Sequence, residues 1–190
     1  MQDYGKTFGQ KQERQVIQTL IDNDLQVSPP TKHEDLRLDI DVWVNNIPIS
    51  IKSPTRKSVE YFKRVVIEHE VMFANGEWHP SWWYNGQSRG YIFLLGESLY
   101  YANKLAFQLF MAHYENDSDV VRWRQLTRQT QEAQRRKKHP HVNARNANVK
   151  IATLINDGVF IYLGKLGGEI DGKILEQSES KSRSEERRVG

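Results

Sequence analysis

Residues 36–52 read LRLDIDVWVNNIPISIK, and this segment carries the pattern that decides the fold. Apolar residues alternate with others on both sides of Asn45 and Asn46, which is the period of a strand with one buried face. Two such runs around a two-residue corner predict a β-hairpin. The register pairs Val42 with Ile49, Trp43 with Pro48 and Val44 with Ile47. Opposite the aliphatic face, one polar face gathers Asp39, Asp41, Ser50 and Lys52.

The chain has the size and composition of one globular domain, which we expect to cover residues 1–175. Within it, residues 8–115 are expected to form the core, and residues 116–150 a basic helix and loop. Residues 176–190 are rich in Ser, Glu, Lys and Arg and are predicted to be disordered. We interpret residues 183–190, RSEERRVG, as the translation of a sequencing adapter.

Several classes of protein are excluded by composition. The chain has no cysteine, so disulfides and thiolate metal sites are ruled out. It has no apolar run near the roughly 20 residues that span a bilayer, so we expect no membrane association. The polar N-terminus has no apolar signal region. A cytoplasmic, intracellular protein is the expectation.

The remaining segments predict an α/β fold around the hairpin. Residues 8–23 show helical spacing, with Glu13 on the same side as the apolar stripe. Residues 59–73 fit helical spacing in part, but the β-branched run Val65, Val66 and Ile67 favours a strand over 64–73. The wholly apolar run 91–95 predicts a central strand covered on both faces. Further predictions are loops at 27–34, 74–88 and 141–148, helices at 98–114 and 120–138, and short elements at 149–154 and 159–163.

Positive charge is concentrated in one part of the chain. Between residues 122 and 150, nine basic residues face one acid, Glu132, on a chain of net charge +3. Such a block is often only the solvated face of a helix, but with so few acids to pair with, phosphate binding is the better interpretation. The predicted nucleic-acid contacts are Arg122, Arg124, Arg128, Arg135, Arg136, Lys137, Lys138 and Arg145.

The order of a helix with Glu13, then Asp41, a hairpin turn, and Ser50-Ile-Lys52 resembles the PD-(D/E)xK nuclease superfamily. The resemblance spans residues 8–100 and is closest to phage-type members. It implies a restriction-endonuclease-like fold, in which a mixed central sheet is flanked by helices, here followed by a basic C-terminal helix. It implies Mg²⁺, or Mn²⁺ in its place, DNA as the substrate, and leaves a homodimer open.

One position departs from that family pattern, since Ser50 stands where the second acid is expected. Glu68, or alternatively Glu70, on the following strand would then have to supply the missing charge. The predicted catalytic set is Asp41, Lys52, Glu68, Glu13 and Ser50, and the predicted metal ligands are Asp41, Glu68 and Glu13.

The residue types support this chemistry without the family name. Mg²⁺ prefers oxygen ligands, commonly one or two carboxylates with water and substrate phosphate. It makes bound water easier to deprotonate, and a lysine beside it orients that water or stabilises the charged phosphate. The function predicted first is therefore a Mg²⁺-dependent DNA endonuclease.

Three other interpretations stay open. Facing Asp and Lys residues on a hairpin are commonly a surface ion pair. Ser50 is also consistent with a decayed site, in a protein of the same fold that binds nucleic acid without cleaving it. Finally, the aromatic segment 78–84 could dock a protein partner.

Overall fold

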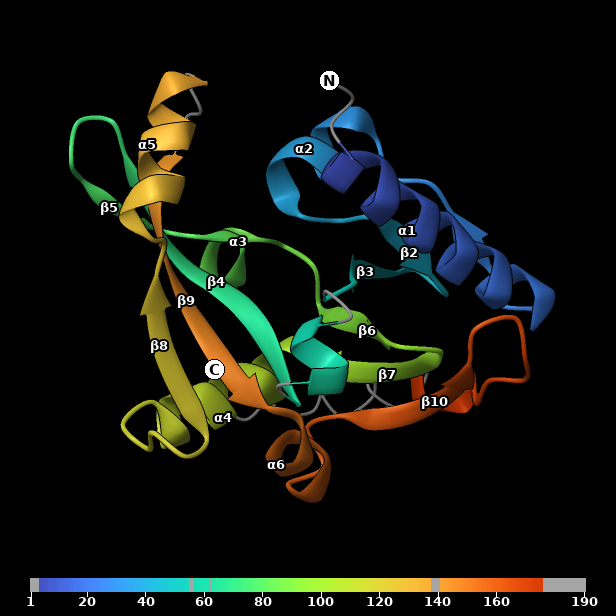
Figure 1. The fold of residues 1–190 in the computed structure, drawn as a ribbon. Coiled ribbons are helices and arrows are strands. Elements are labelled where there is room, and N and C mark those ends of the chain that lie inside the picture. Colours follow the sequence, from blue (N-terminus) through green and yellow to red (C-terminus); the bar gives the residue numbers. More distant parts are fainter. Residues whose placement is uncertain (1–3, 55–56, 62, 138–140, 176–190) are drawn as a thin grey trace, which may run out of the picture.

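The computed structural model describes residues 4–54, 57–61, 63–137 and 141–175 (Figure 1). Within these ranges the protein is mixed α/β with two sheets, which confirms the predicted class. One sheet has the order β1-β2-β3-β6-β7-β10, and its strands are β1 (Val27–Ser28), β2 (Val42–Val44), β3 (Ile47–Lys52), β6 (Gly90–Leu95), β7 (Ser98–Asn103) and β10 (Ile161–Lys165). The other has the order β5-β4-β9-β8, and its strands are β4 (Arg64–Phe73), β5 (Trp78–Pro80), β8 (Val121–Gln125) and β9 (His141–Lys150). The helices are α1 (Tyr4–Asp22), α2 (Lys32–Leu38), α3 (Trp82–Asn85), α4 (Lys104–Tyr114), α5 (Arg128–Arg136), α6 (Ile151–Asn156) and the π-helix η1 (Lys57–Tyr61).

The predicted hairpin is confirmed with its register. Strands β2 and β3 are antiparallel, with Val42 opposite Ile49 and Trp43 opposite Pro48. Asn45 and Asn46 have φ angles of 50° and 63°. Two successive left-handed residues form the turn whose twist matches that of the flanking strands, which explains why asparagine occupies the corner. Strand β3 also pairs with β6 in parallel, so the six-stranded sheet is mixed.

The hairpin is shorter at its start than the alternation suggests, because residues 32–38 form α2. The loop predicted over residues 27–34 is therefore wrong at both ends, since β1 covers residues 27–28 and α2 begins at residue 32. Thr31 begins the helix: its side chain accepts a hydrogen bond from the Glu34 amide, and the Glu34 carboxylate accepts one from the Thr31 amide. This capping box satisfies two backbone donors that the helix itself leaves unpaired.

The helix predicted over residues 120–138 is wrong in its first part. Residues 121–125 form β8, and the helix α5 covers only Arg128–Arg136. Val121 is buried while Arg122 and Arg124 are exposed, so the segment follows the two-residue period of a strand. Thr127 caps α5 by accepting a hydrogen bond from the Thr130 amide, and so sets where the helix begins.

The polar loop predicted over residues 141–148 is also wrong, since these residues belong to β9. This strand lies between β4 and β8 and pairs with both. Its small residues Ala144 and Ala147 are buried in the sheet. The strand predicted over residues 64–73, by contrast, is confirmed as β4.

Residues 98–114, which follow the central strand β6, form a strand and a helix and not the single helix that was predicted. The helix expected over residues 98–114 is a strand, β7, followed by the helix α4, because Asn103 caps α4 by accepting a hydrogen bond from the Ala106 amide. Strand β6 is buried along its whole length, as predicted for residues 91–95. The loop expected over residues 74–88 contains β5 and α3, and the late elements are the end of β9 with α6, and β10.

Two hydrophobic clusters lie on opposite sides of the six-stranded sheet. On one side, Ile92 and Leu94 of β6 pack with the aliphatic face of the hairpin and with Val16 and Leu20 of α1. On the other side, Tyr91 and Phe93 pack with α4 and with the inward residues of β4, β8 and β9. Alternate residues of β6 therefore contribute to both clusters, one on each face of the six-stranded sheet.

Arg64 fixes the end of β8 against β4. Its guanidinium donates to the main-chain carbonyls of Val120, Asn148 and Asp119, at 2.8, 2.8 and 2.7 Å. The residue is 8% exposed; its bond to Val120 is buried, and the other two are partly buried. A charged group that is buried in this way is stable only while its donors are paired.

Candidate active site

The carboxylate of Asp41 is held by two hydrogen bonds. Its Oδ2 accepts from the Ile51 amide at 2.6 Å and from the Ser50 hydroxyl at 2.9 Å. Strand β2 begins only at Val42. The Ile51 amide of β3 therefore donates to the Asp41 side chain and not to a main-chain carbonyl of β2. Ser50 itself is fully buried, which means that its hydroxyl orients Asp41 and does not reach solvent.

Lys52 lies next to Asp39, as the hairpin register predicts. The Lys52 Nζ is 2.7 Å from Asp39 Oδ1, and both side chains are about one-fifth exposed (20% and 19%). Asp39 ends α2 in the left-handed conformation, with φ at 56°. Burial raises the pKa of the Asp39 carboxyl above its ordinary value, against the opposing effect of the Lys52 charge. The ammonium group is therefore positioned by an ion pair that water screens only in part.

Glu13 approaches Asp41 from α1. Its side chain is half-buried and lines a cavity of about 460 Å³ together with Asp41 and Asp35. Burial raises the pKa of Glu13, and the negative charges of Asp41 and Asp35 raise it further. Glu13, Asp35 and Asp41 thus line one cavity, and the charges of the two aspartates add to the effect of burial on Glu13.

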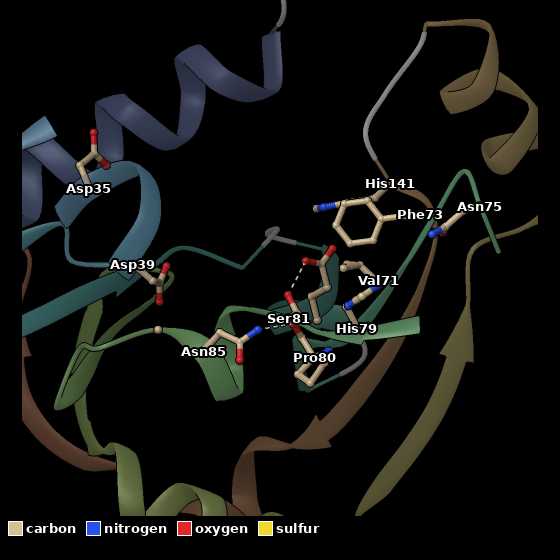
Figure 2. Close-up of a pocket in the computed structure, with 12 residues that line it drawn as sticks. Asp35, Asp39, Val71, Phe73, Asn75, His79, Pro80, Ser81, Asn85 and His141 are labelled. Carbon is tan, nitrogen blue, oxygen red and sulfur yellow. Dashed lines mark hydrogen bonds between the residues drawn. The ribbon is translucent and has the colours of Figure 1, made fainter. Parts of the chain in front are cut away.

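Glu68 faces a different cavity. This second cavity of about 680 Å³ lies between α2 and the strands β4 and β5, and Glu68 lines it with Asp35 and Asp39. The Glu68 Oε1 accepts a hydrogen bond from Ser81 at 2.7 Å. Figure 2 shows Asp35 and Asp39 on one side of this cavity and Ser81 across from them. The alternative, Glu70, pairs with Arg145 at 3.3 Å.

Among the five predicted catalytic residues, Ser50 is hydrogen-bonded to Asp41, Glu13 lines a cavity with Asp41, and Lys52 is paired with Asp39. Glu68 lies apart, and the described part of the chain contains no group of three or more acidic or histidine side chains that could hold a metal ion. The predicted three-ligand set of Asp41, Glu68 and Glu13 is therefore not one cluster. Glu13 and Asp41 are the pair of carboxylates that share a cavity.

The predicted nucleic-acid contacts lie on two elements. Arg122 and Arg124 are exposed on β8, and Arg128, Arg135, Arg136 and Lys137 are exposed on α5 or at its end. Arg128 pairs with Glu132 at 3.2 Å. Lys138 lies outside the described residues.

Arg145 differs from the other predicted contacts because neighbours in the second sheet hold it. Its guanidinium lies 4.3 Å from the Trp123 ring centroid, and it also pairs with Glu70. We interpret Arg145 as a residue that joins β4, β8 and β9.

Asp35 is the site residue that the sequence interpretation missed. It lies on α2, four residues before Asp39, and lines both cavities. A signal was present, because Thr31 and Glu34 have the spacing of a capping box. Had α2 been predicted from that spacing, Asp35 and Asp39 would have been expected one helical turn apart on the same side.

Comparisons with models of protein families, with curated proteins and with solved structures find no match to this chain. The resemblance of α1 and the hairpin to PD-(D/E)xK nucleases accordingly rests on the residues alone. Among the described residues, no helix is long and apolar enough to cross a membrane.

Proposed function

We propose that this chain is a Mg²⁺-dependent nuclease that hydrolyses DNA phosphodiester bonds at a site of the PD-(D/E)xK type. The observation that carries the proposal is that Glu13 of α1 and Asp41, just before β2, line one cavity, while Lys52 of the neighbouring strand β3 is paired with Asp39. Separate parts of the chain supply these groups, so their proximity is not a consequence of sequence spacing.

The carboxylates fit a magnesium site of the open kind. Mg²⁺ commonly uses one or two protein carboxylates and completes its octahedron with water and substrate phosphates. Burial and the nearby Asp41 charge raise the pKa of Glu13, and a divalent cation bound at this cavity would offset both effects. When bound, the ion supplies Lewis acidity and makes water easier to deprotonate, and we expect Mn²⁺ to substitute for it.

The chain's own residues perform three tasks in this proposal. Ser50 and the Ile51 amide both donate to Oδ2 of Asp41 and hold the carboxylate in one orientation. The other oxygen, Oδ1, would then bind the metal ion without a change in the side-chain conformation. Lys52 supplies a positive charge for the developing negative charge on the scissile phosphate. Asp39 positions the Lys52 ammonium group through their 2.7 Å ion pair.

Cleavage is tested with supercoiled plasmid in Mg²⁺, with EDTA as the metal-free comparison. We expect nicking by the wild type, and a loss of about a hundredfold or more in Asp41→Asn and Lys52→Met, because a charge used on the reacting phosphate is removed. Lys165→Met is the matched control, since Lys165 is exposed on β10. Equal nicking by the wild type and both site variants would refute the proposal.

Metal binding is measured separately from cleavage. MgCl₂ should raise the melting temperature of the wild type, because a ligand that binds only the folded state stabilises it. In Glu13→Gln the same addition should have a smaller effect. A melting temperature of the wild type that does not respond to Mg²⁺ or Mn²⁺ would contradict the two-carboxylate site.

The second candidate is a protein that binds nucleic acid without cleaving it. The exposed basic residues of α5 favour it, because only Glu132 pairs with one of them in the described chain. This candidate predicts binding in EDTA that weakens steeply with salt. Neutralising Arg135 and Arg136 should reduce the slope of log affinity against log salt, while the plasmid stays uncut in Mg²⁺.

A further inference from the structure

We propose that the 680 Å³ cavity beside the candidate site binds an unpaired nucleobase that carries an exocyclic amino group. The choice of a nucleic acid as the ligand rests on the proposed function. The volume lies within the range of about 300–1,000 Å³ that small-molecule sites occupy. Through Asp39, the cavity wall also borders the Lys52 ion pair, so a nucleotide here lies next to the proposed chemistry.

One wall of the cavity is aromatic. The ring of Phe73 makes edge contacts with His79 and His141, at centroid distances of 4.9 and 4.8 Å. Figure 2 shows these three residues together on the side of the cavity away from Asp35 and Asp39. Aromatic rings are the usual surfaces on which unpaired bases stack, because every base has a π-face.

Acidic side chains also line the cavity. Asp35, Asp39 and Glu68 line the cavity, so a phosphate group would be repelled from its interior. Exposed basic residues lie close by in the chain: Lys137 ends α5 only four residues before His141. Four residues span at most about 14 Å, so a base inside the cavity can keep its phosphates near the end of α5.

Glu68 is the residue that would recognise the base, through a hydrogen bond to its amino group. Its Oε1 is bonded to Ser81, and within the described chain its Oε2 has no hydrogen-bond partner. A carboxylate accepts a hydrogen bond from the N4 amino group of cytosine, whereas thymine presents a carbonyl at the same position. Cytosine and thymine have rings of similar size, so a preference between them reports the hydrogen bond and not the stacking.

The test compares the binding of two single-stranded oligonucleotides in EDTA by fluorescence anisotropy. One is made of deoxycytidine and the other of thymidine, and both have the same length and phosphate charge. We expect the wild type to bind the cytidine strand about tenfold more tightly, the discrimination that one good base contact supplies. Glu68→Gln should abolish this preference, because its amide can donate to the thymine carbonyl while its oxygen still accepts from Ser81.

Two further variants separate stacking from folding. Phe73→Leu retains an apolar side chain and should weaken both strands about tenfold, since the stacking surface is lost. Glu97→Gln is the control, because Glu97 is exposed between β6 and β7 and lines neither cavity. Melting curves establish that each variant is folded.

The outcomes distinguish this inference from the proposed function. Equal affinity of the wild type for both strands, or a preference that survives in Glu68→Gln, would overturn the base-binding cavity even if Mg²⁺-dependent nicking is observed. If the protein prefers the cytidine strand but never cleaves DNA, the base-binding cavity is supported and the proposed nuclease activity is refuted. Spermidine that raises the melting temperature, together with equal affinity for the strands, would instead assign the cavity to an organic cation.

Discussion

Replacing Ser50 by alanine removes the hydroxyl that orients Asp41. The change removes one hydrogen bond to a charged acceptor, and leaves the 2.6 Å bond from the Ile51 amide in place. Hydrogen bonds to charged groups contribute about 1.5–3 kcal/mol each. We expect the lower half of that range, because Asp41 is only half-buried while Ser50 is fully buried.

The loss is measured as the free energy of unfolding in urea and as the melting temperature. In a domain of this size, 1 kcal/mol corresponds to about 2–4 °C, so Ser50→Ala should melt about 3–8 °C lower. Because the orientation of Asp41 becomes less restricted, Mg²⁺-dependent nicking should fall while binding of DNA in EDTA stays unchanged. The two measurements together separate a role in positioning from a role in DNA binding.

Ser28→Ala is the matched control for this experiment. Ser28 is an exposed residue of β1, the edge strand next to β2, and exposed substitutions usually change stability by less than about 0.5 kcal/mol. A Ser50→Ala protein as stable and as active as Ser28→Ala would show that the hydroxyl does not hold Asp41, and the geometric argument for the site would fail.

Three further changes test other parts of the structure. The pKa of Glu13 is raised above its ordinary value of 4.5, so its ionised form weakens the fold; Glu13→Gln should raise the free energy of unfolding at pH 7, and urea titrations should find this gain absent below about pH 4. Arg64→Met removes three hydrogen bonds from a charged donor, although the Val120 carbonyl keeps the Lys150 amide as a donor, and should cost about 2 kcal/mol in urea denaturation; no loss would contradict the role assigned to Arg64. In Gly90→Ala the new Cβ would lie 2.5 Å from the Tyr101 ring, so a loss of about 1–3 kcal/mol is expected by thermal melting, whereas Gly9→Ala in α1 meets no atom within 4 Å and should not destabilise.

Local patterns predicted the hairpin well and the basic segment poorly. Asn45 and Asn46 encode their turn through their own backbone preferences, so its register followed from the sequence. Residues 120–138 have few apolar positions, and the helical and strand periods compete there without a decisive burial signal. The pairing of β8 with β9 decided the outcome, and β9 also pairs with β4, a strand that ends almost fifty residues before β8 begins.

The candidate site shows the same division. The two-residue period of a strand is local, so the sequence by itself determined that Asp41 and Ser50 face each other and that Lys52 lies beside Asp39. The sequence could not decide whether the acid on α1 or the acid on β4 reaches Asp41, because the answer depends on how elements pack on different faces of the sheet. The tertiary structure decided it: α1 packs on the aliphatic face of the hairpin and brings Glu13 to Asp41, while β4 belongs to the second sheet and directs Glu68 into the neighbouring cavity.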